Sequence, residues 1–310
     1  MRLPFAFASA VIAAPLAAQA PVPSPGELIA NAPASDWKAI RPSDLLVMDL
    51  APDTAGTARR VVIQLIPAPF SQGWIGNIRK LAGARWWDGL AVNRVQENYV
   101  VQWGDPEAEN KAKAKPLPPG LATIPQSAYT VPNFHGRGGV LPEDAATAHR
   151  QPDPYGAIGE HVSGWPVGYG GKNEGWPLHC YGAVGVGRDM PPDTGSGAEL
   201  YTVIGHAPRH LDRNIAVVGR IIEGIEHLST LPRGTGPLGF YEKPEQRTVI
   251  RSIRIGTDVG DLPAYQYLST SSSSFAAFVE ARRNRRDAFF IRPAGGADIC
   301  NLPVPVRRAQ

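Results

Sequence analysis

The chain has 310 residues, with 31 basic and 28 acidic side chains and a formal net charge of +3. A charge this close to balance gives no strong field for nucleic acid or for an anionic membrane, so we expect neither as a partner. The 33 glycines and 31 prolines predict many turns and long irregular connections. The length permits a large hydrophobic core, and we expect one main domain.

The first twenty residues have the pattern of a secretory signal peptide. Arg2 supplies the positive end, residues 3–16 are apolar, and Ala18-Gln19-Ala20 is a small-x-small cleavage site. Pro21 disfavours cleavage directly before it, so processing after Ala18 is an alternative. A membrane anchor is the other interpretation, but two prolines interrupt a run shorter than about 20 apolar residues. The sequence therefore predicts a periplasmic protein without stable membrane insertion.

Only two cysteines occur, Cys180 and Cys300. In an oxidising compartment an even count favours one disulfide, which here would close a loop of about 120 residues. On the chain-entropy model such a loop stabilises the fold by up to about 5 kcal/mol. Two buried free thiols are the alternative.

Taken in chain order, residues 21–35 are rich in proline and alanine and predict a flexible lead-in, with structure beginning near Asp36. Apolar residues at helical spacing predict helices over 74–82 and 222–230. Short runs rich in branched residues predict about eight strands. The strands are expected over 45–50, 60–66, 90–95, 99–103, 183–186, 200–204, 216–220 and 248–255.

Two further segments differ in composition from the rest. Residues 107–178 combine lysines with many prolines and glycines, which predicts a long insertion of irregular backbone, either functional or partly disordered. Residues 266–310 form a C-terminal extension with a serine-rich spacer and a helix over 275–290. We interpret the four arginines of that helix as lying on its solvent-exposed face; the alternative is that they contact acidic partners.

No pattern indicates a metal or a cofactor. His206 and His210 are four residues apart, but Pro208 between them prevents an ordinary helix, so the two rings need not share a face. Nucleophile-elbow, CxxC and phosphate-binding glycine motifs are absent from the sequence. We therefore expect no cofactor and no metal site.

Several short motifs in a fixed order resemble the cyclophilin family of peptidyl-prolyl isomerases. They are similar to the family's A-P, N-F, L and Y-D-G landmarks, then to F-x-R-[IV] and Q-G-G-D-P, and finally to L-D and F-G-x-V-x-x-G. In this chain they read Ala68-Pro69, Asn77-Ile78, Leu81, Trp87-Asp88-Gly89, Val92-Asn93-Arg94-Val95, Gln102-Trp103-Gly104-Asp105-Pro106, Leu211-Asp212 and Val218-Gly219-Arg220-Ile221-Ile222-Glu223-Gly224. The resemblance covers roughly residues 40–260 without the insertion.

The resemblance implies a mainly β fold over residues 36–265. We expect a closed eight-stranded antiparallel barrel capped by two helices, interrupted by the insertion at 107–178 and followed by an extra C-terminal helix. It also implies cis-trans isomerisation of X-Pro bonds, with proline-containing polypeptides as clients. We expect a monomer.

Carried over residue by residue, the resemblance implies one catalytic residue, Arg94, and Gln102 as the side chain that helps hold it and the substrate backbone. The remaining substrate-binding residues are expected to form the pocket around the proline. They are Tyr99 as the aromatic wall, Val100 in place of a methionine, Leu200 in place of a polar contact, Thr202 in place of the phenylalanine floor, His210 in place of a tryptophan, Leu211 as the retained leucine and Ile215 in place of a histidine.

Two functions follow. The first is an isomerase in which Arg94 stabilises the twisted amide electrostatically. The second is a catalytically weak periplasmic binding module or chaperone, motivated by Leu200, Thr202 and Ile215, which depart from the family pattern. In that case the long insertion would contact the partner.

Overall fold

The computed structural model describes residues 22–135 and 147–309. The predicted signal peptide, residues 1–20, lies outside these residues. Among the residues described, no helix is both long and apolar enough to span a membrane.

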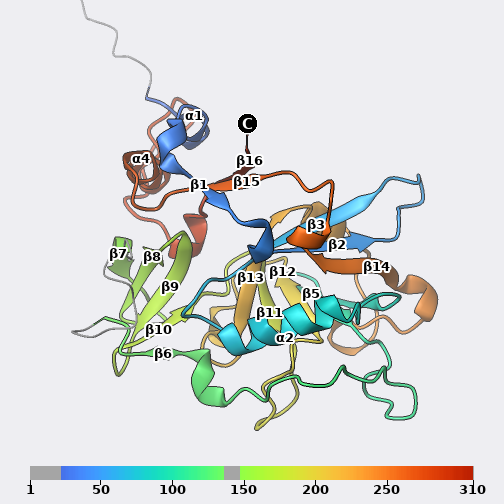
Figure 1. Cartoon of the computed structure of the whole chain (residues 1–310). Helices are drawn as coiled ribbons and strands as arrows, with labels where there is room; N and C mark the ends of the chain where they lie inside the picture. Colours follow the sequence, from blue (N-terminus) through green and yellow to red (C-terminus); the bar gives the residue numbers. More distant parts are fainter. Residues whose placement is uncertain (1–21, 136–146, 310) are drawn as a thin grey trace, which may run out of the picture.

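Eight antiparallel strands close into a barrel (Figure 1), which confirms the predicted fold class. Each strand pairs with the next, and the last pairs with the first. In pairing order the strands are β11 (Ala183–Val186), β12 (Leu200–Val203), β5 (Val100–Gly104), β4 (Ala91–Val95), β14 (Thr248–Ile255), β2 (Leu45–Leu50), β3 (Arg59–Leu65) and β13 (Val217–Glu223).

Side chains alternate between the inside and the outside of the barrel, as the two-residue period of a strand requires. On β2 and β3, Leu46 and Ile63 belong to the large interior core. Their neighbours Leu45 and Val62 are also buried, but in a separate cluster on the outer face. These two strands therefore read as continuous apolar runs because both of their faces are covered.

Two helices pack against the barrel core. Helix α2 (Gln72–Gly83) buries Trp74, Ile78 and Leu81 in the interior cluster, as its spacing predicts. Helix α3 (Glu226–Ser229) is much shorter than the expected helix over 222–230.

The start of that predicted helix is wrong because strand β13 continues to Glu223. Gly224 then turns the chain with a φ of +83°. A Cβ at this position would lie 2.1 Å from the carbonyl oxygen of Arg60, so the turn requires glycine.

The insertion contains a five-stranded sheet, so the prediction of irregular backbone throughout 107–178 is wrong. Its order is β6-β10-β9-β8-β7, with bounds β6 (Val131–Pro132), β7 (Thr147–Pro152), β8 (Ile158–Val162), β9 (Trp165–Gly170) and β10 (Glu174–Pro177). Glycines in these strands give room to aromatic rings. A Cβ on Gly175 would lie 2.4 Å from the ring of Phe134, and one on Gly168 would lie 2.5 Å from the indole of Trp176. These glycines suggest turns in the sequence, but in the structure they lie within strands, where the absence of a side chain lets an aromatic ring pack against the backbone.

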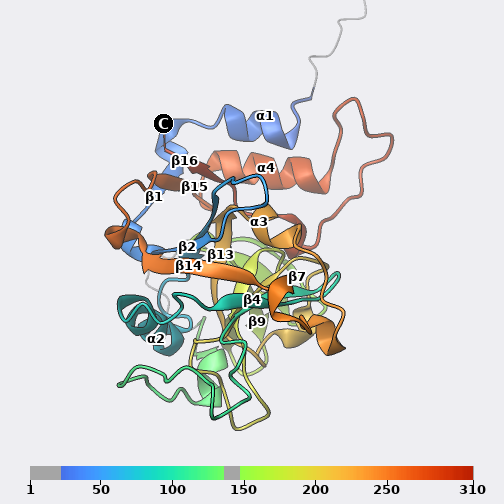
Figure 2. The same ribbon diagram turned by 90° about the vertical axis from the view of Figure 1, so that its right-hand side faces the viewer.

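The two ends of the described chain pack together beside the barrel (Figure 2). Strands β1 (Trp37–Ile40), β15 (Tyr265–Leu268) and β16 (Val306–Arg308) form one sheet, and helices α1 (Pro25–Ala30) and α4 (Ser273–Arg283) lie side by side. The lead-in is therefore not flexible throughout: α1 begins with a capping box between Ser24 and Glu27. Helix α4 ends at Arg283, seven residues before the predicted end at 290.

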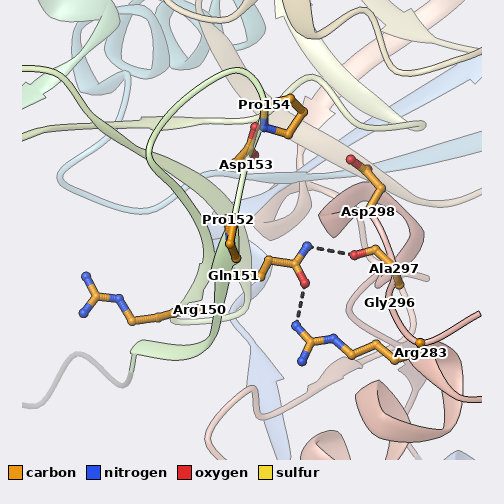
Figure 3. Close-up of a pocket in the computed structure, with 10 residues that line it drawn as sticks. Arg150, Gln151, Pro152, Asp153, Pro154, Arg283, Gly296, Ala297 and Asp298 are labelled. Atoms are coloured by element: carbon orange, nitrogen blue, oxygen red, sulfur yellow. Dashed lines mark hydrogen bonds between the residues drawn. The ribbon is translucent and has the colours of Figure 1, made fainter.

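The predicted disulfide between Cys180 and Cys300 is confirmed. It joins the segment after the insertion to the C-terminal extension. Gln151 of β7 also binds the extension, donating to the carbonyl oxygen of Ala297 at 2.9 Å and accepting from Arg283 at 2.5 Å (Figure 3). These side chains border a cleft of about 420 Å³ between β7 and the extension. The extension is thus fastened to the insertion.

Candidate active site

The larger described cavity, about 810 Å³, lies over the outer faces of β4, β5 and β12. It brings together six of the nine residues predicted for the site. These are Arg94, Tyr99, Val100, Gln102, Leu211 and Ile215. The three predicted residues that do not line it are Leu200, Thr202 and His210.

Arg94 on β4 is partly buried, and each of its three nitrogens donates to a fixed acceptor. Nε donates to the carbonyl oxygen of Leu238 at 2.7 Å, Nη1 to Oε1 of Gln102 at 3.2 Å, and Nη2 to Oε1 of Gln96. Burial lowers the pKa of Arg94, yet a guanidinium keeps its charge at neutral pH. A guanidinium carries five N–H bonds, so two remain for a substrate beyond the contacts within the described chain.

Aromatic rings flank the guanidinium on two sides. Its central carbon lies 5.7 Å from the ring centre of Tyr99 and 5.4 Å from that of Phe240. The ring of His210 is stacked on Tyr99, with 6.3 Å between centres, so His210 supports the wall from outside the cavity. Phe240 and Leu238 belong to a loop after α3 that the resemblance did not single out, and both line the cavity.

The prediction that Leu200 and Thr202 contact the substrate is wrong by one position in the strand register. On β12, Tyr201 lies opposite Gln102, while Leu200 and Thr202 lie opposite Trp103 and Val101. Both predicted residues are fully buried, and Leu200 belongs to the interior core. A slip of one residue moves every side chain of a strand to the other face.

With the register corrected, Gly197-Ala198-Glu199-Leu200-Tyr201 stands at the G-S-Q-F-F motif. Tyr201 then takes the place of the aromatic floor, and Glu199 takes the place of the polar contact. Both line the cavity. The two-residue alternation of side chains is the signal in the sequence that identifies them.

A buried polar chain holds the hydroxyl of Tyr201. That hydroxyl lies 2.9 Å from Nε2 of His179, and Nδ1 of His179 lies 2.9 Å from Oδ1 of Asp212. Arg209 donates to Asp212 at 2.6 Å and to Asp153 of the insertion at 2.8 Å. All of these groups are buried, so a continuous series of buried polar contacts connects Tyr201, at the floor of the pocket, to Asp153 in the insertion.

The carboxyl group of Glu199 lies beside Gln102. Oε1 accepts a hydrogen bond from the backbone N–H of Asp105 at 2.6 Å, and Oε2 accepts one from Nε2 of Gln102 at 3.5 Å. A Cβ on Gly104 would lie 2.0 Å from Oε1, so glycine at this position makes room for the carboxyl group. Burial raises the pKa of Glu199 to about 7, although hydrogen bonds from the backbone of Asp105 and from the side chains of Gln102 and Asn93 act in the opposite direction.

The sequence landmarks around helix α2 position the start of β12. The indole of Trp87 donates to the carbonyl oxygen of Ala198 at 2.8 Å, and the amide of Asn77 donates to that of Ser196 at 3.0 Å. The first part of the insertion lines one side of the cavity. It is held there by a hydrogen bond in which Asp105 accepts from the backbone N–H of Lys115 at 2.7 Å. Within 22–135 and 147–309, no three His, Cys, Asp or Glu side chains are grouped as a metal site would require.

Comparison with known proteins agrees with this geometry. Residues 54–255 match the family model described as cyclophilin type peptidyl-prolyl cis-trans isomerase/CLD. The chain therefore belongs to this family, and it is a cyclophilin-type peptidyl-prolyl cis-trans isomerase.

Among solved structures, cyclophilin AquaCyp293 from Hirschia baltica is similar to the chain with a TM-score of 0.61 at 20% identity. The match covers 88% of this chain and 94% of that one, and supports the fold. A cyclophilin type isomerase from Cryptosporidium parvum, solved in the presence of the dipeptide Ala-Pro, has a TM-score of 0.37 at 12% identity, with 67% and 98% covered. No curated protein matches the sequence.

Proposed function

We propose that Arg94 catalyses the isomerisation by stabilising the twisted amide. The observation that carries this proposal is the guanidinium itself, held at three nitrogens with two N–H bonds left over. Resonance keeps the X-Pro amide planar, and a lone pair develops on the prolyl nitrogen only as the C–N bond twists. An N–H aimed at that lone pair binds the transition state more tightly than the ground state.

The required effect is small. An uncatalysed X-Pro bond isomerises in tens of seconds, so a turnover of about 10 per second requires about 3–4 kcal/mol. A charge-assisted hydrogen bond and an apolar surface for the proline ring are sufficient. Val100, Leu211, Ile215 and the floor residue Tyr201 supply such a surface in the cavity.

The clients we propose are folding or exported polypeptides in the periplasm, with the enzyme acting as a monomer. The leader-like N-terminus supports the location, and the disulfide agrees with an oxidising compartment. The alternative of a binding module rested on three departures from the family pattern. Two of these, Leu200 and Thr202, face the barrel interior and say nothing about the pocket.

The test is the cis-trans exchange rate of short X-Pro peptides, measured by NMR for the wild type and for Arg94→Ala. Arg251→Ala is the matched control, because Arg251 is exposed on β14 and is not among the residues that line the cavity. We expect exchange to be lost in Arg94→Ala and retained in the control. If the wild type binds the peptides without accelerating exchange, the protein is a prolyl-peptide binding module.

A further inference from the structure

We infer that Glu199 is a positioning residue that makes isomerisation depend on pH, by setting which way the amide of Gln102 faces. This rests on the proposed role of Arg94. The contacts form a continuous chain from the backbone of Asp105 through Glu199 and Gln102 to the guanidinium. A carboxyl group at this place adds a titratable group to a site in which the G-S-Q-F-F motif has an amide.

When Glu199 is ionised, both of its oxygens are acceptors only. Oε2 then holds the NH₂ end of Gln102, so the amide oxygen of Gln102 faces Nη1 of Arg94. In this state each donor from Asp105 to Arg94 faces an acceptor, and Arg94 is held in place.

When Glu199 is protonated, one of its oxygens becomes a donor. Oε1 continues to accept from the backbone N–H of Asp105, which leaves Oε2 to carry the proton. Two side-chain amides act on this carboxyl group, those of Gln102 and Asn93, and Gln102 is the one that also contacts Arg94. A proton on Oε2 that faces Gln102 turns the amide oxygen of Gln102 toward Glu199, which places the NH₂ of Gln102 opposite the N–H of Arg94. Two donors face one another, and the guanidinium loses one of its three anchors.

The surroundings place this change near neutral pH. The carboxyl group is partly buried between β12, the end of β5 and Gly187, and burial raises its pKa to about 7. The negative charge of Asp105 acts in the same direction. The other charged groups that line the cavity are Arg94, Glu109, Lys111, Lys115, Arg188, Asp189 and Asp193.

The experiment follows kcat/KM for an X-Pro peptide from pH 5.5 to 8.5 in the wild type, Glu199→Gln and His210→Gln. We expect wild-type activity to rise about tenfold with a midpoint near pH 7, since one hydrogen bond to a charged group is restored. Glu199→Gln should show no such transition, because an amide does not titrate. His210→Gln controls for the imidazole beside Tyr99 and should keep the transition.

A second measurement does not depend on activity. The side-chain NH₂ signals of Gln102 in ¹⁵N NMR should shift with pH about the same midpoint in the wild type and stay constant in Glu199→Gln. A flat wild-type profile with constant NH₂ signals would overturn the inference, and so would a transition that persists in Glu199→Gln. If Arg94→Ala remains active while the NH₂ signals titrate, the role of Arg94 fails and the coupling of Glu199 to Gln102 stands.

Discussion

The corrected register of β12 predicts opposite effects for two neighbouring residues. Tyr201→Ala removes the floor of the pocket, whereas Thr202→Val changes a side chain inside the barrel. Burial of a methylene contributes about 0.8 kcal/mol, and a floor that covers about half of the proline ring then contributes about 1 kcal/mol. We expect KM to rise about fivefold in Tyr201→Ala.

Thr202→Val should leave kcat and KM unchanged and raise the free energy of unfolding by about 1 kcal/mol. Oγ1 of Thr202 is buried without a hydrogen-bond partner among the described residues, and an unpaired hydroxyl is costly. The assay is NMR exchange on X-Pro peptides, with circular dichroism to verify that both variants are folded. A larger change of KM in Thr202→Val than in Tyr201→Ala would refute the register and restore Thr202 as the floor.

Three further predictions concern stability. Arg209→Met should lower the free energy of unfolding in urea by about 3–5 kcal/mol, because Asp153 and Asp212 lose their buried counter-charge. A loss below about 1 kcal/mol would contradict a stabilising role for these two ion pairs. Reduction of the Cys180–Cys300 disulfide should cost up to about 5 kcal/mol, with the Cys180→Ser and Cys300→Ser double variant insensitive to reductant; equal stability with and without reductant would argue against the bond. Burial lowers the pKa of His161 to about 4, below the ordinary value near 6.5. Between these two values the unfolded chain binds a proton that the folded protein does not, so the free energy of unfolding falls as the pH falls from 6.5 toward 4. The wild type should lose about 3 kcal/mol over that range relative to His161→Gln, and parallel pH curves for the two proteins would show that His161 is not responsible.

The barrel could be predicted from the sequence because its signals are local. Apolar runs such as Leu45–Leu50 and the spacing of Trp74, Ile78 and Leu81 reflect contacts that each element makes with one common core. The strands of the insertion could not be predicted in this way. Their glycines, such as Gly168 and Gly175, read as turns, and only the tertiary contacts show that they accommodate aromatic rings.

The same division applies to the site. Arg94 and Gln102 lie in motifs whose spacing defines the position, and the structure brings them within 3.2 Å. The G-S-Q-F-F motif matches this chain too weakly to fix the alignment to one residue, so the pairing of β12 with β5 is needed to show that Leu200 and Thr202 face the interior. Phe240 and Leu238 come from a loop with no motif, so sequence alone gives no reason to place them beside Arg94.

The central claim is that a fixed guanidinium accelerates the reaction, and Arg94→Lys tests it most directly. Lysine keeps the positive charge but lacks the planar fork that binds Leu238, Gln102 and Gln96 together. Measured by NMR exchange on one X-Pro peptide, the account predicts that Arg94→Lys loses most of the acceleration while the peptide still binds. Full activity in Arg94→Lys would contradict the account, since charge alone would then be sufficient.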